Sequence, residues 1–125
     1  MLLQPARVQL PGGGYIDVDG VNEAEGIYVE AYAHQGKLRG GQPDKVASDA
    51  LKLALLARLR PECRRPILLF ASNDAASSFE GNRWTARAIR EFGIKVHVVD
   101  LTSEVVAGLN AAQIRQPMVP AEVSA

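Results

Sequence analysis

The sequence predicts a single α/β domain with a mixed β-sheet and the element order βββαβαβ. Three segments with strand-like patterns follow one another at short intervals, which favours an antiparallel meander. A long amphipathic helix comes next, and the continuous apolar run after it is typical of a strand buried on both faces. The strand-helix-strand order of the second half requires right-handed parallel crossovers. We therefore expect a mixed sheet with helices on its faces.

The first three strands are predicted from alternating side chains and from the turn residues between them. Residues 6–10 alternate apolar and polar side chains, and the glycine-rich stretch 11–14 ends this strand in a hairpin turn. Residues 15–19 form the second strand. Residues 27–34 form the third strand, which is rich in β-branched and aromatic side chains. The second and third strands are therefore expected to be neighbours.

The central helix is predicted to run from residue 43 to about residue 59. Pro43 suits the first turn because its missing N–H would be unpaired there, and Pro61 ends the helix. An apolar stripe at helical spacing predicts the buried side: Val46, Ala50, Leu53, Ala54 and Ala57, widened by Leu51, Leu55 and Leu56. A polar stripe lies beside it: Lys45, Ser48, Asp49 and Lys52.

The second half of the chain predicts a buried strand followed by a shorter helix. Residues 66–71 are the apolar run that forms the strand. Ser77 or Ser78 is expected to cap a helix over residues 79–91, in which Trp84 anchors the core.

The C-terminal part is predicted to hold a last strand and little regular structure after it. Residues 94–99 alternate and form that strand, and residues 102–109 are expected to form a short helix. We expect the domain to occupy residues 1–113 and residues 114–125, which contain two prolines, to form a flexible tail.

Composition places the chain among ordinary globular proteins. Lys plus Arg and Asp plus Glu both number 14, so the formal charge is zero, unlike the basic excess of an autonomous nucleic-acid-binding domain. Cys63 is the single cysteine, which excludes an intrachain disulfide and fits a reducing cytoplasm. No stretch is long and apolar enough to span a membrane, and the N-terminus lacks the pattern of a signal peptide. We expect a cytoplasmic protein without a membrane partner.

Acidic residues on the second and third strands form the most informative motif. Asp17 and Asp19 are predicted to lie on one face of the second strand, and Glu30 of the third strand can share that face across the ladder. Carboxylates on adjacent strands are suited to hold a divalent cation. The alternative is purely structural: Glu30 forms a salt bridge with Lys45 or Lys52, or is exposed on an open sheet face.

These acids, and the order of the elements around them, resemble the restriction-endonuclease-like core of the PD-(D/E)xK nuclease superfamily. That family has an acid on the second core strand, (D/E)xK on the third, then a helix and a buried strand. Residues 15–20 look like the first acidic segment and residues 28–32 look like the second, and the similarity spans roughly residues 6–101. The resemblance implies hydrolysis of phosphodiester bonds in DNA with Mg²⁺, or Mn²⁺, as the cofactor.

The resemblance also implies which residues bind the metal and where the chain departs from the family. Asp19 (or Asp17) and Glu30 would be the metal ligands. Tyr32 occupies the position of the family's lysine, and a phenol cannot supply a positive charge. The family further implies a helix before the first strand, whereas only a few residues precede Ala6. We therefore expect that a partner, or a further part of a longer chain, covers the surface that this helix would cover.

Some members of the superfamily place the lysine on the following helix. Lys45 or Lys52 would then take that part here, and Lys37 could reach in from the preceding loop. Contacts with DNA are expected from Lys37, Arg39, Gln42 and Lys45.

The sequence leaves more than one function open. The retained acids favour a metal-dependent nuclease. The missing lysine and the zero net charge favour a non-catalytic binding or assembly module that keeps the fold, as a homodimer or with a larger protein partner. A small, unrelated α/β regulatory domain is a third possibility, in which the acids would not share a cleft.

Overall fold

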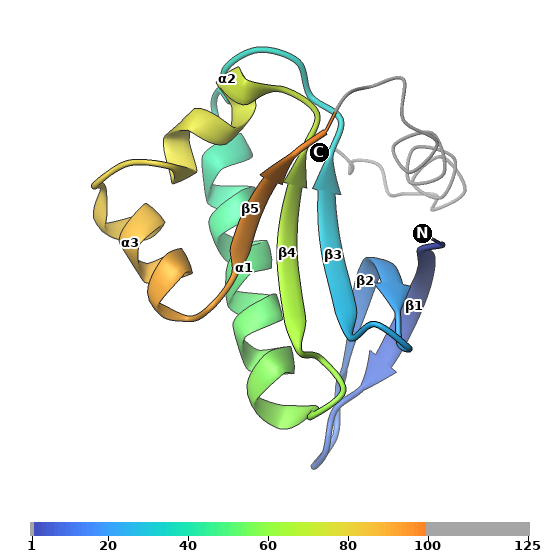
Figure 1. Ribbon diagram of the computed structural model, residues 1–125. Coiled ribbons are helices and arrows are strands. Elements are labelled where there is room, and N and C mark those ends of the chain that lie inside the picture. Colours follow the sequence, from blue (N-terminus) through green and yellow to red (C-terminus); the bar gives the residue numbers. More distant parts are fainter. Residues whose placement is uncertain (1, 100–125) are drawn as a thin grey trace.

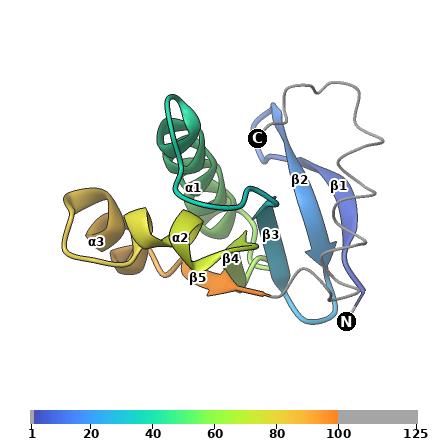
Figure 2. The same cartoon turned by 90° about the horizontal axis from the view of Figure 1, so that it is seen from above.

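The computed structural model describes residues 2–99, which form a five-stranded mixed sheet with helices on one side (Figures 1 and 2). The strands lie in the sheet in the order in which they occur in the chain: β1 (Gln4–Gln9), β2 (Tyr15–Asn22), β3 (Ile27–Tyr32), β4 (Arg65–Phe70) and β5 (Lys95–Val98). β1, β2 and β3 form an antiparallel meander, and β3, β4 and β5 are parallel. The predicted mixed α/β class and the antiparallel-then-parallel order are confirmed.

The helices are connections between the parallel strands. They are α1 (Gln42–Leu59) between β3 and β4, and α2 (Asn73–Ala76), the 3₁₀ turn η1 (Ser77–Phe79) and α3 (Trp84–Glu91) between β4 and β5. α1 has Pro43 in its first turn and ends before Arg60, whose extended backbone leads into Pro61. The proline signals therefore predicted both ends of α1 correctly to within a residue.

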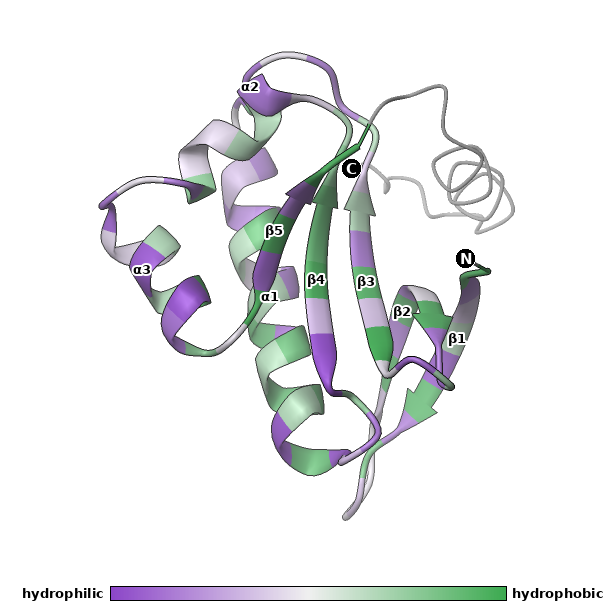
Figure 3. Ribbon diagram, in the orientation of Figure 1, coloured by the Kyte–Doolittle hydropathy of each residue, from purple (hydrophilic) through white to green (hydrophobic). Residues whose placement is uncertain are grey.

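The main core lies between the sheet and α1. Leu53 and Leu56 of α1 are fully buried against Leu68 and Phe70 of β4, and Tyr32 and Phe70 stack with ring centroids 5.0 Å apart. β4 is apolar along most of its length (Figure 3), as expected for a strand between two neighbours. Burying each such side chain contributes roughly 1.5–3 kcal/mol, so this layer fixes where α1 lies on the sheet.

The predicted helix over residues 79–91 is wrong at its start. The chain instead forms α2, capped by the Ser72 hydroxyl, which accepts the Ala75 N–H at 3.0 Å, and α3 begins only at Trp84. Phe79 is buried, so the chain must turn outward after it, and the Gly81 region provides that turn. Trp84 is 78% exposed and does not anchor the core.

The predicted apolar stripe of α1 is too wide. Val46, Ala50, Leu53 and Leu56 are buried, but Leu51 is 72% exposed. Leu55 is also exposed. Only one side of α1 faces the sheet, so Leu51 and Leu55, which lie on another side of the helix, reach solvent.

The hairpin of β1 and β2 curls away from the other strands and stands beside α1 (Figure 2). Its turn is the predicted glycine stretch, in which the Gly13 N–H donates to the Leu10 carbonyl oxygen at 3.0 Å. Lys52 Nζ of α1 donates to the carbonyl oxygen of Asp17 at 3.4 Å, and Arg60 Nη1 donates to that of Gln9 at 3.0 Å. α1 is therefore bonded to both strands of the hairpin.

A β-bulge changes the alternation of side chains within β2. Ala6 of β1 pairs with Val18, but Gln4 pairs with Val21, so β2 contains one extra residue between these pairs. Pro5, which has no N–H for the ladder, lies opposite the bulge on the edge strand. Val18 and Val21 both reach the core beneath α1, which strict alternation over three positions would forbid.

Two predictions fall beyond the described part of the chain: the short helix at residues 102–109 and the flexible tail at residues 114–125 lie outside residues 2–99. Among the described helices, none has the length and apolar character needed to cross a membrane.

Candidate functional site

Where β2 and β3 diverge, a carboxylate on each strand accepts a hydrogen bond from a backbone N–H of the other strand. Their backbone register ends with Gly20 opposite Val29. Beyond it, the Asp19 N–H donates to Glu30 Oε2 at 3.3 Å, and the Ala31 N–H donates to Asp19 Oδ2 at 2.9 Å. Each carboxylate therefore bonds the backbone of the other strand, and the structure brings Asp19 and Glu30 together as the sequence predicted.

Glu30 is a buried carboxylate with little compensating charge. Its side chain is 3% exposed and lies on the α1 side of β3, between the buried residues Tyr28 and Tyr32. Burial raises its pKa to about 8, and the nearby Asp19 carboxylate adds to the rise. Burial also raises the pKa of Asp19. The hydrogen bond from the Ala31 N–H stabilises the charged form and lowers the pKa, but by less. Burial therefore favours the protonated form of Glu30.

Asp49 brings a third carboxylate to the same place from α1. It is 2% exposed, and its Oδ2 accepts a hydrogen bond from the Tyr32 hydroxyl at 2.7 Å. Burial and the Asp49 charge hold the pKa of Tyr32 well above its ordinary value, so the phenol remains a donor. Tyr32 occupies the position where the resemblance implies a lysine, and its hydroxyl points inward to an acid instead of to the surface.

Two lysines of α1 converge on these acids. Lys45 Nζ lies 2.8 Å from Asp49 Oδ2, and Lys52 Nζ lies 3.4 Å from Asp49 Oδ1 and 3.6 Å from Glu30 Oε1. Burial lowers the pKa of Lys52, but Glu30 and Asp49 outweigh it, so the net shift is upward and the ammonium is kept charged. Glu30 and Lys52 lie within ion-pair distance, the contact that a purely structural role predicts, and both partners are charged once Glu30 loses its proton.

Together these five side chains form what we call the acid–lysine cluster: Asp19, Glu30, Asp49, Lys45 and Lys52. It holds three carboxylates and two ammonium groups from β2, β3 and α1. Removing such charges from water costs several kcal/mol per ion, which pairing repays only in part.

The cluster contains carboxylate oxygens, the ligands that a hard divalent cation prefers, but they are not arranged as a closed metal site. Within residues 2–99, no group of three or more His, Cys, Asp or Glu side chains is arranged to hold a metal ion. Mg²⁺ keeps several waters and is commonly held by one or two carboxylates. Asp19 and Glu30 supply two carboxylates, and the pKa of Glu30 is raised first by burial and then by the charge of Asp19.

Asp17 lies apart from the cluster. Arg7 Nε donates to its Oδ1 at 2.8 Å and Arg7 Nη2 donates to its Oδ2 at 3.1 Å, on the exposed outer side of the hairpin. The expectation that Asp17 and Asp19 share a face is not met, because the bulge after Val18 changes the alternation between them. Of the two predicted aspartates, only Asp19 lies with Glu30.

The predicted DNA-contacting residues lie around the loop between β3 and α1. Lys37 and Arg39 are exposed on this loop, and Lys45 is half-exposed at the start of α1. Gln42 has a structural part, because its Oε1 accepts the Arg39 N–H at 2.8 Å and its Nε2 lies 3.4 Å from His34 Nδ1. Lys45 is therefore part of the cluster, Lys37 and Arg39 are exposed on the loop that precedes α1, and Gln42 and His34 brace that loop.

Asp49 is the cluster residue that sequence reasoning missed. The sequence places it only in the polar stripe of the helix, with Lys45, Ser48 and Lys52. The signal that could have found Asp49 is Tyr32, its hydrogen-bond partner. A buried tyrosine hydroxyl needs an acceptor, and Asp49 lies on the helix that covers Tyr32.

Comparison of the chain with protein-family models, with curated proteins and with solved structures found no match. The function of the chain must therefore be inferred from the acid–lysine cluster and from its position in the fold.

Proposed function

We propose that this chain is a Mg²⁺-dependent nuclease domain of the restriction-endonuclease-like fold, which hydrolyses phosphodiester bonds in DNA. The observation that carries the proposal is the meeting of Asp19 and Glu30 beside the ammonium of Lys52. The two acids come from the second and third strands of a meander, and the lysine comes from the helix that follows. That is the arrangement the resemblance implies once the lysine has moved to the helix.

Asp19 and Glu30 would hold the metal ion. When bound, Mg²⁺ lowers the pKa of a coordinated water and neutralises negative charge on the phosphate. Glu30 must lose its proton to become a ligand, so metal and proton compete for the same carboxylate. The backbone N–H groups of Asp19 and Ala31 fix the orientation of both side chains before any ligand arrives.

Lys52 would supply the positive charge that Tyr32 cannot. Its side chain is 35% exposed, so it can face both the buried acids and a phosphate at the surface. Asp49 acts as a positioning residue, because it holds the ammonium groups of Lys45 and Lys52 while the Tyr32 hydroxyl holds its Oδ2. In this assignment Tyr32 contributes indirectly, because it holds Asp49 in place and Asp49 positions the two lysines.

The test is a cleavage assay on linear and supercoiled DNA with Mg²⁺ or Mn²⁺. We expect cleavage by the wild-type protein and a loss of roughly 100-fold or more in Asp19→Asn, Glu30→Gln and Lys52→Met, because each removes charge at the reacting phosphate. Asp17→Asn is the matched control: it removes a carboxylate from the same strand, but one that pairs with Arg7. Cleavage that survives Glu30→Gln in a folded protein would contradict the assignment.

A second candidate is a non-catalytic binding or assembly module that retains this fold, alone as a homodimer or with a larger partner. The observation that favours it is the number of internal bonds on Asp49, which accepts from Tyr32 and pairs with both lysines. Such a cluster is already close to neutral without a ligand. This candidate would be supported by a protein that binds Mn²⁺ but cleaves no DNA. It would also be supported by a protein that neither binds Mn²⁺ nor cleaves DNA.

A further inference from the structure

Each of the two acids assigned to the metal ion has one carboxylate oxygen held by the backbone of the neighbouring strand. Glu30 Oε2 accepts the Asp19 N–H at 3.3 Å, and Asp19 Oδ2 accepts the Ala31 N–H at 2.9 Å. The other oxygen of each carboxylate, Oε1 of Glu30 and Oδ1 of Asp19, is not engaged by these two bonds. A metal ion shared by both acids would therefore bind Glu30 through Oε1.

The ammonium group of Lys52 lies beside that same oxygen of Glu30. Lys52 Nζ is 3.6 Å from Glu30 Oε1, 3.4 Å from Asp49 Oδ1 and 3.4 Å from the carbonyl oxygen of Asp17. Oxygen atoms from β3, α1 and β2 thus surround one positive charge. All three distances are long for hydrogen bonds, so charge holds the lysine here more than directed bonding does.

A divalent ion and this ammonium group cannot both occupy the space beside Glu30 Oε1. Mg²⁺ binds a carboxylate oxygen at about 2.1 Å and keeps several waters around it. The waters of an ion bound to Oε1 would reach the position of Lys52 Nζ, which lies 3.6 Å from that oxygen. Two cations at such a short separation also repel each other strongly. Metal binding therefore requires the ammonium to move.

Asp49 offers Lys52 a second partner when it leaves Glu30. The two residues lie three positions apart on α1, and the Lys52 side chain is 35% exposed, so its flexible stem can move outward while it stays near Asp49. Lys45 is held differently, because its Nζ donates to both oxygens of Asp49 at 2.8 Å. Among the described residues, Lys52 is the lysine that contacts both Glu30 and Asp49.

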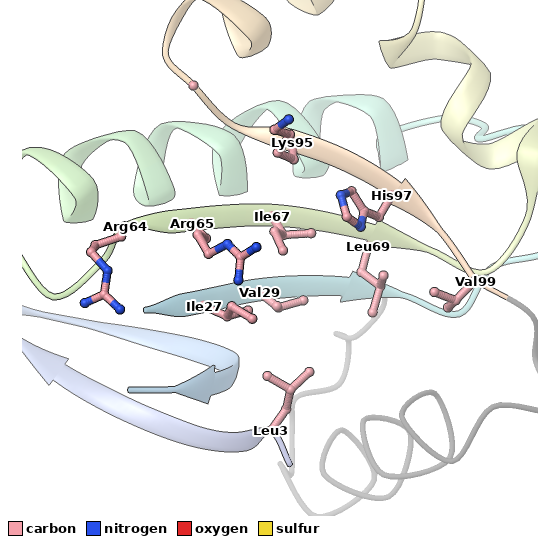
Figure 4. A pocket seen from close by; sticks show the side chains of 11 residues that line it. Leu3, Ile27, Val29, Arg64, Arg65, Ile67, Leu69, Lys95, His97 and Val99 are labelled. Atoms are coloured by element: carbon pink, nitrogen blue, oxygen red, sulfur yellow. The ribbon is translucent and has the colours of Figure 1, made fainter. Parts of the chain in front are cut away.

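Other basic side chains near β3 lie on the opposite face of the sheet. Arg65, Lys95 and His97 line an apolar groove there (Figure 4), whereas Glu30 faces α1. They cannot replace Lys52 at Glu30. Within residues 2–99, the compensation of the Glu30 charge by direct contact therefore comes from Lys52.

We propose that Lys52 is an internal competitor of the metal ion. In the metal-free chain its ammonium occupies the cation position beside Glu30, and a bound metal ion displaces it toward Asp49 and the surface. This inference rests on the proposed function, because it takes Asp19 and Glu30 as the metal ligands. The displaced ammonium then faces a phosphate, so the lysine reaches the substrate side only when the metal is bound.

The test measures the Kd of Mn²⁺ without DNA, from the electron paramagnetic resonance signal of the free ion. We expect Lys52→Met to bind Mn²⁺ roughly tenfold more tightly than wild type, because the competing charge is gone. Its removal also favours a proton on Glu30, but a divalent ion carries twice the charge and gains more. Lys45→Met is the matched control: it removes an ammonium that pairs with Asp49 alone, and it should change the Kd less than about threefold.

The outcomes separate this inference from the proposed function. Equal gains in the two variants would overturn the inference, because they would show a general effect of charge, and the proposed function would stand since Mn²⁺ still binds. If neither wild type nor any variant binds Mn²⁺, the proposed function falls and the inference falls with it. Binding by Lys52→Met alone would support the inference.

Crystal structures of the wild-type protein provide a direct measurement that needs no variant. With EDTA we expect Lys52 Nζ near its present 3.6 Å from Glu30 Oε1. With Mn²⁺ bound at Glu30, this separation should exceed about 4 Å, the limit of an ion pair, while Lys52 stays close to Asp49. An unchanged contact between Lys52 and Glu30 beside a bound Mn²⁺ ion would overturn the inference.

Discussion

At the scale of single residues, the buried carboxylate of Glu30 has too little positive charge around it for full ionisation at neutral pH. Its pKa of about 8 lies far above its ordinary value of 4.5. Between these two values, the folded chain binds more protons than the unfolded chain. Glu30 therefore makes folding stability fall as the pH rises through this window, and the full stability is present only below it.

We predict that Glu30→Gln removes most of this pH dependence. In buffer with EDTA, the wild-type protein should lose a few kcal/mol of unfolding free energy between about pH 5 and about pH 8, whereas the variant should lose much less. Asp19, whose pKa burial also raises, accounts for a remainder. Urea denaturation at several pH values measures the difference.

Asp17→Asn is the control for this prediction. Arg7 lowers the pKa of Asp17, so that group titrates below the window and contributes no slope within it. The variant should follow the wild-type curve from about pH 5 to about pH 8. A Glu30→Gln protein whose stability still falls as steeply as wild type would show that Glu30 ionises normally in the folded chain.

Tyr32 permits a second prediction at this scale. Tyr32→Phe removes the donor to Asp49 and leaves a buried carboxylate oxygen with one partner fewer. The expected cost is about 1–3 kcal/mol of unfolding free energy. Tyr15→Phe removes a hydroxyl from an exposed tyrosine and should change stability by less than about 0.5 kcal/mol. Equal effects would mean that the Asp49 bond contributes nothing to stability.

At the scale of elements, the turn between β2 and β3 sets the register that brings Asp19 to Glu30. Gly26 has φ +71°, and its carbonyl oxygen accepts the N–H groups of Arg64 and Arg65 at 3.1 and 2.8 Å. The turn therefore ties the meander to the start of β4. A Cβ on Gly26 would lie 3.1 Å from Arg64 Cβ, so there is little room for any side chain.

We predict that Gly26→Ala costs about 2 kcal/mol, from the left-handed backbone together with the contact at Arg64. Gly81→Ala is the matched control, because a Cβ there meets nothing within 4 Å. It should change stability by less than about 0.5 kcal/mol. Thermal unfolding of the two variants checks this, and similar melting temperatures would contradict it.

The elements themselves could be predicted from sequence more reliably than the directions of their side chains. Pro43 and Pro61 fix the ends of α1 locally, and the apolar run 66–71 identifies β4. Trp84 was misplaced because an aromatic residue in a helical pattern does not reveal whether the helix turns it toward the core. The bulge in β2 depends on pairing with Pro5 of another strand, which no local pattern in β2 contains.

The same limit applies to the candidate site. Asp19 and Glu30 were predicted to meet, and they do, but the reason given was regular alternation with Asp17. The structure reaches that result through an irregular strand. Asp49 could not be distinguished from a solvated helix residue, because its burial and its bond to Tyr32 depend on how α1 packs on β3.

At the scale of the whole molecule, the balanced charge constrains how DNA would be bound. With 14 basic and 14 acidic residues, long-range attraction to a phosphate backbone is weak. Under the proposed function, DNA binding would then depend on the local cations Lys37, Arg39 and Lys45 and on a metal ion held by Asp19 and Glu30. Neutralising the buried acids should therefore matter more to this protein than a general basic surface.

We predict that Mn²⁺ stabilises the whole fold. At a concentration one hundred times its Kd, the gain is about 2.7 kcal/mol, which raises the melting temperature of a domain of this size by several degrees. EDTA should reverse the shift, and Glu30→Gln should abolish it, whereas Asp17→Asn should keep it. If Mn²⁺ does not change the melting temperature of the wild-type protein, the cluster does not bind the metal.

The extra residue in β2 also decides on which side of the strand Asp19 lies. Deleting Gly20 would restore an uninterrupted pleat opposite Pro5 and would turn Asp19 to the exposed side of the hairpin, where Asp17 lies. Such a deletion would break both side-chain bonds that now join Asp19 and Glu30 across β2 and β3. The ionic centre of this domain therefore depends on one irregular position in β2.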